Sequence, residues 1–440
     1  MTPTSPDTPI RADLARLLAG LWPALADPPA AVVRRAQRLW LDTVSCAAAG
    51  LSADEPRRWL DEAARGDAGA VPLPAAGRCV SPPSAAMALA LGACWDEACE
   101  GLAIAHGRPG VPVVAALWAA LPARPASWLD LWRATVAGYE VAGRLGARLR
   151  MKPGLHVDGT WGAFGAAVAS VHLAGGTWQQ ALDAVETAAT QLPLSLLRPV
   201  HQGANVRNLY LGHSAWLGLQ AAQAVHAGMR SPVGAVDDFA ALALDGSATG
   251  SWPDPGRWLI LDSYWKPFAA VRHVHYGAQA ALVLRAQGLA VDRIDDIRLR
   301  IYAEALQYCA NRAPATPLGA QFSLSFGVAA ALAFGDLSPA EFRAPRFDDP
   351  LLRRLEAMVR IEADPGAFPD GQRGAVLEVR AEGRSVLHRQ GAITGDPGHD
   401  PDEAAVQAKF DRYSRRDAAL AAWARRMLHD DPRAAACLPT

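Results

Sequence analysis

The chain has 440 residues, of which 51% are hydrophobic and 20% are charged, and its formal net charge is −1 at pH 7. This length and composition are typical of two or three globular domains built around at least one large core. A net charge near zero provides no field that attracts nucleic acid or an anionic membrane, so we expect neither as a partner.

The six cysteines, at positions 46, 79, 94, 99, 309 and 437, form no CxxC pair. Their spacing predicts reduced, mostly buried thiols and disfavours both a disulfide framework and an iron–sulfur cluster. The N-terminus, "MTPTSPDTPIR", lacks the basic and apolar regions of a signal peptide, and the longest apolar runs are too short to span a bilayer. We therefore expect a cytoplasmic protein.

Helical periodicity dominates the first 260 residues. "PPAAVVRRAQRLWLDTVSCAAAG" places its apolar residues near one face and ends on Gly50, which predicts a helix C-cap. Ser127 and Thr177 precede two further helical segments, and Thr177 begins the capping box of "TWQQ". No strand alternation interrupts this region, so we predict that it is entirely helical.

The pattern changes after "DSYWKPF". "IDDIRLRI" alternates apolar and polar residues, "AMVRIEAD" and "GAVLEVRAEGRSVLHR" repeat the alternation, and Glu382-Gly383 predicts a hairpin turn. "SLSFGVAAALAFG" predicts a helix between these strands, and the C-terminal tail is helical again. We predict a mainly α protein with a large helical domain and a smaller α+β lid domain. Their expected bounds are 1–264, completed by a C-terminal helix at 403–440, and 265–402.

None of the familiar catalytic motifs is present in the sequence: there is no GxSxG, P-loop, HExxH or GxGxxG. The segment "GACWDEACEGLAIAHGRPG" instead places Asp96 and Glu100 four residues apart, which predicts a shared helix face, and His106 follows. A carboxylate near a histidine suits acid–base chemistry, because each group shifts the pKa of the other. Charges at a solvated helix end would give the same pattern.

Three later segments add cationic and imidazole side chains. In "GLHVDGTWGAFG", His156 precedes a glycine-rich helix start, where backbone N–H groups favour an anion. In "NVRNLYLGHSAWLG", Arg207 precedes an apolar helix. "SYWKPFAAVRHVH" places Lys266 and Arg272 at the expected domain junction, where clefts are common. These cations suit a substrate with several carboxylates.

His273 and His275 form an HxH pair in the last of these segments. On a strand, both rings would point to one face and could share a zinc ion, but no spacing indicates a third ligand. We therefore expect no metal. From the residues alone we interpret the chain as a lyase or isomerase that acts on an anionic small molecule.

Taken in order, these segments resemble the MmgE/PrpD family, which includes 2-methylcitrate dehydratase, cis-aconitate decarboxylase and iminodisuccinate epimerase. The resemblance covers residues 12–415. It rests on "RRAQRLWLDTVSCAAAG", on "DE" followed ten residues after Asp96 by "HGRPGVPVVAAL", and on "ATVAGYEVAGRL", "LHVDGTWGAFGAAVAS", "RNLYLGHSAWLGLQAAQAVHAGM", "WKPFAAVRHVH" and "QFSLSFGVAAALAFGDL". It implies a site between a helical domain and an α+β lid, a homodimer, and activity without a metal or organic cofactor.

The resemblance also assigns roles to individual positions. The family's site residues match Asp96, His106, His156 and Lys266, which we predict to be catalytic. For substrate binding, the candidates are Glu100, Arg207, Arg272 and His275.

Several positions depart from the family pattern. Arg207 replaces a common lysine, and although arginine keeps the charge, it does not readily give up a proton. Val271 stands where relatives often carry Cys or His, and Phe326 removes the hydroxyl of a "SLPY"-like site. Tyr276 and Gln279 replace residues of a more usual "HPAIDA"-like ending.

The leading functional hypothesis is a cofactor-independent lyase of the dehydratase type that acts on a di- or tricarboxylate. Arg207, Lys266 and Arg272 would hold the carboxylates. His156 or His106 would remove the proton alpha to a carboxylate, and Asp96 would orient or polarise its partner. Lys266 or a histidine would protonate the departing hydroxyl. An epimerase or isomerase, or a decarboxylase, is the alternative within the same fold. A non-catalytic member of the family is the remaining alternative.

Overall fold

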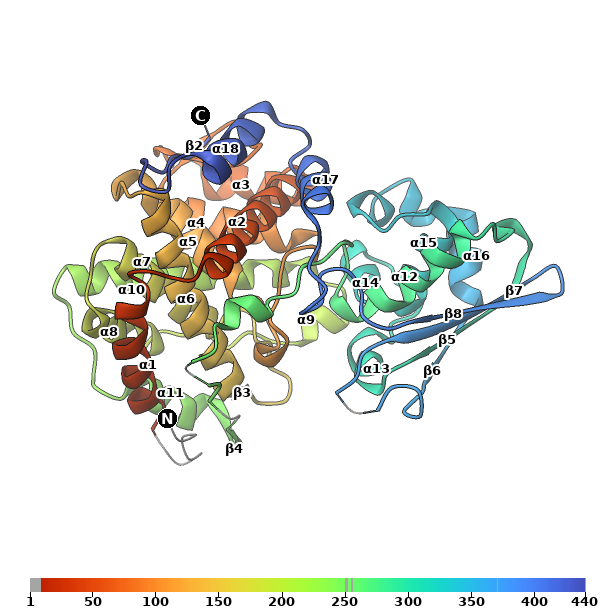
Figure 1. Ribbon diagram of the computed structural model, residues 1–440, viewed down its shortest axis with the longest axis horizontal. Coiled ribbons are helices and arrows are strands. Elements are labelled where there is room, and N and C mark those ends of the chain that lie inside the picture. Colours follow the sequence, from red (N-terminus) through yellow and green to blue (C-terminus); the bar gives the residue numbers. More distant parts are fainter. Residues whose placement is uncertain (1–8, 250–251, 255, 370, 440) are drawn as a thin grey trace.

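A computed structural model describes residues 9–249, 252–254, 256–369 and 371–439. Residues 1–8, on which much of the expectation of no signal peptide rests, lie outside this description. The described elements form two parts that lie side by side (Figure 1). Among the described helices, none combines the length and the apolar character needed to span a lipid bilayer.

We call the larger of these two the helical part. It contains α1 (Ile10–Ala24), α2 (Ala30–Leu51), α3 (Asp54–Ala63), α4 (Pro82–Trp95), α5 (Gly110–Ala120), α6 (Trp128–Arg148), α7 (Gly162–Leu173), α8 (Trp178–Ala189), α9 (Arg198–His201), α10 (Leu209–His226), α11 (Ala235–Ala243), α17 (Glu403–Tyr413) and α18 (Ala418–His429). Two short antiparallel pairs accompany them, β1 (Val71–Pro72) with β2 (Cys79–Val80) and β3 (Leu149–Met151) with β4 (Leu244–Thr249).

The smaller, α+β part contains α12 (Arg272–Ala286), α13 (Ala303–Cys309), α14 (Pro317–Gln321), α15 (Leu324–Phe334), α16 (Pro350–Met358), β5 (Ile294–Ile301), β6 (Val359–Ala363), β7 (Ala375–Ala381) and β8 (Arg384–Gln390). The strands form one sheet in the order β6-β5-β7-β8, in which β5 and β6 are parallel and the other neighbours antiparallel. The predicted hairpin turn is confirmed, because Glu382 and Gly383 both have positive φ, at 53° and 74°.

Each part has its own hydrophobic core. The core of the helical part extends from Ile10 in α1 to Ile260 and also includes residues of α17 and α18. Trp40 of α2, Trp118 of α5 and Trp423 of α18 contact one another, with ring centroids 5.7–6.5 Å apart. The C-terminal tail therefore packs on the helical part. The second core lies between α12, α15 and the buried face of the sheet.

The mainly α fold with a smaller α+β part is confirmed, and so are two predicted helix starts. The Ser127 hydroxyl accepts the backbone N–H of Asp130, and Thr177 forms a complete capping box with Gln180. The expectation of an all-helical first region is wrong in detail, since β1–β2 and β3–β4 are present. β1, β2 and β3 have only two or three residues, and the sequence of β4, "LDGSAT", does not alternate between apolar and polar residues.

The prediction that Gly50 caps a helix is also wrong, because α2 continues to Leu51. The residue serves a helix–helix contact. A Cβ atom at Gly50 would lie 2.0 Å from the backbone oxygen of Gly92 in α4. Only glycine allows α2 and α4 to approach this closely.

A buried ion pair attaches the tail to the helical part next to the segment that follows α4. The Lys409 ammonium of α17 donates to the Asp42 carboxylate of α2 and, at 2.7 Å, to the backbone oxygen of Ala98. Asp42 also accepts the backbone N–H of Glu100 at 3.0 Å. Asp42 thus connects three segments that are distant in sequence.

We expect the substitution Asp42→Asn to lower the free energy of unfolding by roughly 3–5 kcal/mol, because it leaves the Lys409 ammonium buried without a counter-ion. Denaturant unfolding measures this loss. The matched control is Glu62→Gln, which breaks an exposed ion pair: the Glu62 side chain is 72% exposed and that of Arg65 is 74% exposed. This variant should lower the free energy of unfolding by less than about 1 kcal/mol. Equal losses in both variants would contradict this account.

Candidate active site

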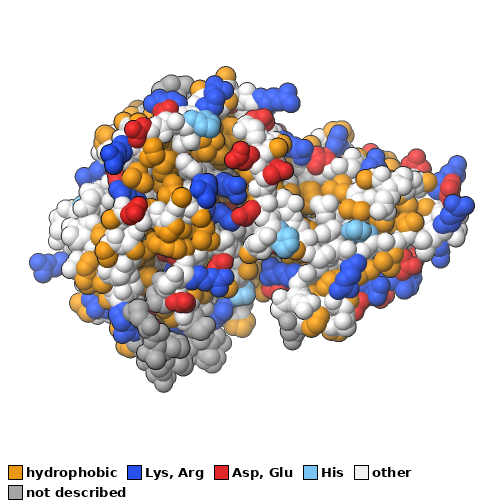
Figure 2. Space-filling model, in the orientation of Figure 1, with side chains coloured by type: hydrophobic (Ala, Val, Ile, Leu, Met, Phe, Trp, Pro, Cys, Tyr) orange, Lys and Arg blue, Asp and Glu red, His pale blue; other side chains and the backbone are white. Residues whose placement is uncertain are grey.

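A cavity of about 400 Å³ lies where the two parts meet. In the space-filling view the molecule narrows at this place, and Lys, Arg and His side chains gather there (Figure 2). Loops around residues 102–108 and 149–158 form the wall on the helical side. Residues 271–273, Glu304 and Arg373 belong to the opposite wall.

The segment between α4 and α5 carries the first group of polar residues. The chain leaves α4 after Trp95, folds back so that the Leu102 N–H donates to the Gly107 oxygen at 2.8 Å, and enters α5 at Gly110. Glu97 and His106 have φ values of 53° and 54°, in the left-handed region that disfavours residues with a side chain. Strain of this kind is concentrated at functional sites, where surrounding contacts maintain it.

Glu97 is the centre of a buried ionic cluster. Its Oε1 atom accepts from Arg108 at 2.7 Å and also from Arg207, and its Oε2 atom lies 3.2 Å from the Lys266 Nζ. Lys266 also donates to the backbone oxygen of Glu97 at 2.7 Å. The second guanidinium N–H group of Arg108 donates to Asp158. Three cations therefore share two carboxylates, and we call these five residues the ionic cluster.

The ionic cluster holds both of its acids in the charged form. Burial alone raises the pKa of Glu97, but Arg108, Arg207 and Lys266 outweigh burial and hold this pKa well below its usual range. Burial alone also raises the pKa of Asp158, but Arg108, His156 and Arg207 together outweigh it and lower this pKa. Both carboxylates are therefore ionised at neutral pH.

His156 lies beside the ionic cluster and stays neutral. Burial lowers its pKa to about 4. Its Nδ1 atom lies 3.0 Å from the backbone nitrogen of Asp158, and since a backbone N–H can only donate, Nδ1 must accept. The proton of the neutral ring is therefore on Nε2, so His156 offers a hydrogen-bond donor.

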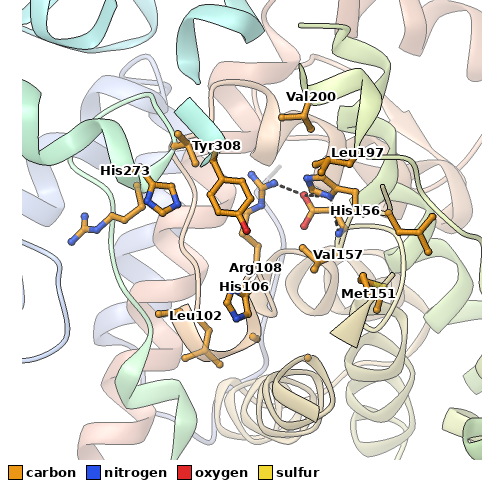
Figure 3. Close-up of a pocket in the computed structure, with 18 of the residues that line it drawn as sticks. Leu102, His106, Arg108, Met151, His156, Val157, Leu197, Val200, His273 and Tyr308 are labelled. Carbon is orange, nitrogen blue, oxygen red and sulfur yellow. Dashed lines mark hydrogen bonds and ion pairs between the residues drawn. The ribbon is translucent and has the colours of Figure 1, made fainter. Parts of the chain in front are cut away.

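His106 lies on a different loop and remains exposed at the cavity (Figure 3). Burial lowers the pKa of its ring, and Arg150 lowers it further. Its ring makes no hydrogen bond to another residue of the described chain. A neutral, accessible imidazole can accept a proton from a bound molecule.

The wall from the α+β part contains a histidine, a tyrosine and an ion pair, and Tyr302 lies outside the lining. His273 contacts the Tyr302 hydroxyl through Nδ1 at 2.6 Å, and its ring stacks on Tyr308 at a centroid distance of 5.4 Å. Arg373 pairs with Glu304 at 3.2 Å. This wall therefore adds little net charge to the cavity.

Five of the eight predicted site residues line this cavity, and three do not. Those that line it are His106, His156, Arg207, Lys266 and Arg272. Asp96, which we expect to be catalytic together with His106, does not line the cavity. Asp96 follows the last residue of α4, turns away from the cavity, and accepts from Arg343 of the α+β part at 2.9 and 3.0 Å.

The other two residues are bound inside the protein. Glu100 does not share a helix face with Asp96, because α4 ends at Trp95. Its carboxyl group accepts the Gly110 N–H at the start of α5 (2.8 Å) and lies 3.2 Å from the Tyr139 hydroxyl. Burial raises the pKa of Glu100 to about 8.

His275 is fully buried, and its Nε2 atom lies 2.9 Å from the Ala270 oxygen. The alternative of a zinc-binding HxH pair on a strand does not hold, since His273 and His275 lie in the first turn of α12. Within the described ranges, no cluster of three or more His, Cys, Asp or Glu side chains could hold a metal ion.

Sequence reasoning missed three members of the cavity wall that matter most for its charge: Glu97, Arg108 and Asp158. Each lies within two residues of a predicted site residue, in "DE", "HGR" and "HVD". Their proximity in the chain was a signal, but their pairing with one another depends on three loops meeting. Two residues that depart from the family pattern lie in different surroundings. Val271 lines the cavity, whereas Phe326 is buried in the core of the α+β part and stacks on Phe342.

The neutral state of His156 predicts a pH-dependent stability. Between its ordinary pKa of about 6.5 and its folded value of about 4, the unfolded chain binds a proton that the folded chain does not, so acidification favours unfolding. From pH 7 to pH 5, this residue should lower the free energy of unfolding by roughly 2 kcal/mol. Denaturant unfolding at both pH values should show a smaller difference for His156→Gln. His429→Gln, at an exposed position, should keep the wild-type difference. An unchanged difference in His156→Gln would refute the assignment.

Comparison of the chain with known protein families gives two matches. Residues 12–243 match the MmgE/PrpD N-terminal domain, and residues 268–425 match the MmgE/PrpD C-terminal domain. The second match extends into α18, although α17 and α18 pack on the helical part. No curated protein matches the chain in sequence. Because the two matches cover most of the residues, the chain belongs to the MmgE/PrpD family.

Proposed function

We propose that the chain is a cofactor-independent lyase of the dehydratase type that acts on a di- or tricarboxylate. Membership of the MmgE/PrpD family supports a lyase-like, enzymatic role in general. The class of substrate rests on the charge of the cavity. Dehydration of a hydroxy acid removes a proton and a hydroxide from neighbouring carbons, so it needs a base, an acid and a site for the carboxylate.

The single observation that carries the substrate class is the excess of positive charge along the cavity wall. Among the described residues that line it, cationic side chains outnumber carboxylates by more than two to one. Asp396, which lies outside the wall, already balances Arg272. An anionic substrate would balance the remaining excess through charge-assisted hydrogen bonds. The cations are Arg108, Arg150, Lys152, Arg207, Lys266, Arg272 and Arg373, and the carboxylates are Glu97, Asp158 and Glu304.

We assign the general base to His106. It is neutral at pH 7, exposed to the cavity and without a hydrogen-bond partner in the described chain, as a base requires. The lone pair of its ring would take the proton alpha to the substrate carboxylate. The electrons of that C–H bond would form the new double bond as the C–O bond breaks.

His156 and Lys266 would act on the oxygen atoms. The Nε2–H of His156 would donate to the carboxylate, on which negative charge accumulates while the proton leaves. Lys266 carries a positive charge beside Glu97 and can give a proton to the departing hydroxide, which leaves as water. Arg207 would hold the carboxylate and transfer no proton, in agreement with its replacement of a lysine.

Epimerisation is the second candidate, because three histidines line the same cavity, namely His106, His156 and His273. A two-base epimerase needs two of these imidazoles to exchange protons with one carbon atom. The Asp158 N–H occupies the accepting nitrogen of His156, which makes this ring a donor and favours the lyase. The homodimer and the cytoplasmic location remain predictions.

Proton NMR in heavy water distinguishes these reactions. The purified protein is offered 2-methylcitrate, citrate, cis-aconitate, and hydroxy- and amino-dicarboxylates. We expect a vinylic product signal from a hydroxy acid. Deuterium at an alpha carbon without net consumption would establish the epimerase instead, and consumption with release of carbon dioxide would establish a decarboxylase. No reaction with any of these acids would count against the proposal.

On the substrate found in this way, we expect His106→Gln to lower kcat by roughly 10²–10⁴-fold, because the general base is lost. Wild-type activity should fall at acidic pH with a midpoint below the ordinary histidine pKa of about 6.5, because burial lowers the pKa of His106. His213→Gln is the matched control, since His213 is exposed and lies outside the cavity wall. A folded His106→Gln variant with wild-type kcat would exclude His106 as the base.

A further inference from the structure

The inner wall of the cavity has room for only one additional negative charge. Arg108, Arg207 and Lys266 supply three positive charges, and Glu97 and Asp158 cancel two of them. These five side chains are almost completely buried. A buried anion without a matching cation loses its hydration, and no ion pair offsets this loss. The ionic cluster can therefore hold one carboxylate, but it does not suit several.

A separate apolar cluster lies next to this wall. Val200, Leu318 and Phe322 form a small hydrophobic cluster that belongs to neither main core, and Leu197 and Val271 pack against it. It contains residues from both the helical part and the α+β part. All of its members except Leu318 line the cavity. We call these five residues the apolar cluster.

The apolar cluster and the ionic cluster are in direct contact. The Arg207 guanidinium lies over the Phe322 ring, 5.5 Å from its centroid. Leu197 and Val200 lie beside His156, on the side of the cavity opposite His273 (Figure 3). A ligand whose carboxylate reaches Arg207 must therefore place its next atoms against apolar side chains. Leu197 and Val271 are only half-buried, so they still offer apolar surface to such a ligand.

We propose that the substrate is a carboxylic acid with an alkyl or aryl substituent of several carbon atoms, which packs against the apolar cluster while the ionic cluster holds one carboxylate. This inference rests on the proposed function and specifies its substrate. A second carboxylate would be held at the exposed rim, where Arg150 and Lys152 line the cavity. A compact tricarboxylate would leave the apolar cluster in contact with water.

The test is calorimetric binding of unreactive acids, namely succinate and its 2-methyl, 2-propyl and 2-hexyl derivatives. These acids lack the hydroxyl group, so turnover does not interfere. We expect the wild-type Kd to fall about fourfold for each added methylene until the apolar cluster is covered, as burial of a methylene group predicts. In Leu197→Ser the dependence on chain length should be much weaker, while the Kd of succinate stays the same.

Val233→Ser is the matched control, because Val233 is 79% exposed and does not line the cavity. It should keep the wild-type dependence on chain length. Val271→Ser changes the apolar cluster on the side of the α+β part. It should weaken the dependence on chain length in the same way, so the test does not depend on the folding of Leu197→Ser alone. If the wild-type protein binds all four acids equally, the apolar substituent is disproved and the lyase proposal stands. If it binds none of them, nor citrate, both proposals fail.

Discussion

The sharing of Glu97 among Arg108, Arg207 and Lys266 is the interaction on which the candidate site depends. Three cations this close together repel one another strongly in a medium of low dielectric constant. A buried glutamate alone would be equally unfavourable, because it would lose its hydration. Each charge is stable only because the others are present. The four residues come from three segments of the chain, so the cluster also fixes how these segments meet.

Backbone geometry puts Glu97 in place. The residue has a left-handed conformation directly after α4, and its own backbone oxygen accepts from Lys266. Asp42 holds the following turn through the Glu100 N–H, and Asp96 is bound to Arg343 across the junction of the two parts. The strain of a left-handed residue, of the order of 1–2 kcal/mol, is thus balanced by contacts on both sides. Asp96 and Glu97 are each paired with an arginine, which accounts for two carboxylates in an otherwise apolar region.

The charge arrangement also bears on the chemistry. His156 is neutral, and the Asp158 N–H determines its tautomer, so its Nε2–H can only donate. His106 has no such partner among the described residues, and its ring nitrogen remains available to accept a proton. One imidazole can donate and the other can accept. A site with one donor and one acceptor suits elimination, in which a proton and a leaving group depart from different atoms.

Much of the fold could be predicted from the sequence, because helical and strand periodicities and capping residues act over a few neighbours. The helix starts at Ser127 and Thr177 and the turn at Glu382-Gly383 are examples. The site could be predicted only in part. His106, His156, Arg207 and Lys266 were identified as candidates, but their partners Glu97, Arg108 and Asp158 were not.

What the sequence determined by itself was the mainly helical character of the first region, the strands of the α+β part, the family, and the residue types available for acid–base chemistry. Only the tertiary structure decided which carboxylate faces the cavity. Asp96 and Glu97 are neighbours with similar side chains, and a single left-handed residue after α4 directs one to Arg343 and the other to the ionic cluster. Local sequence contains no information on that choice, because the cations that stabilise Glu97 lie 11 to 169 positions further along the chain.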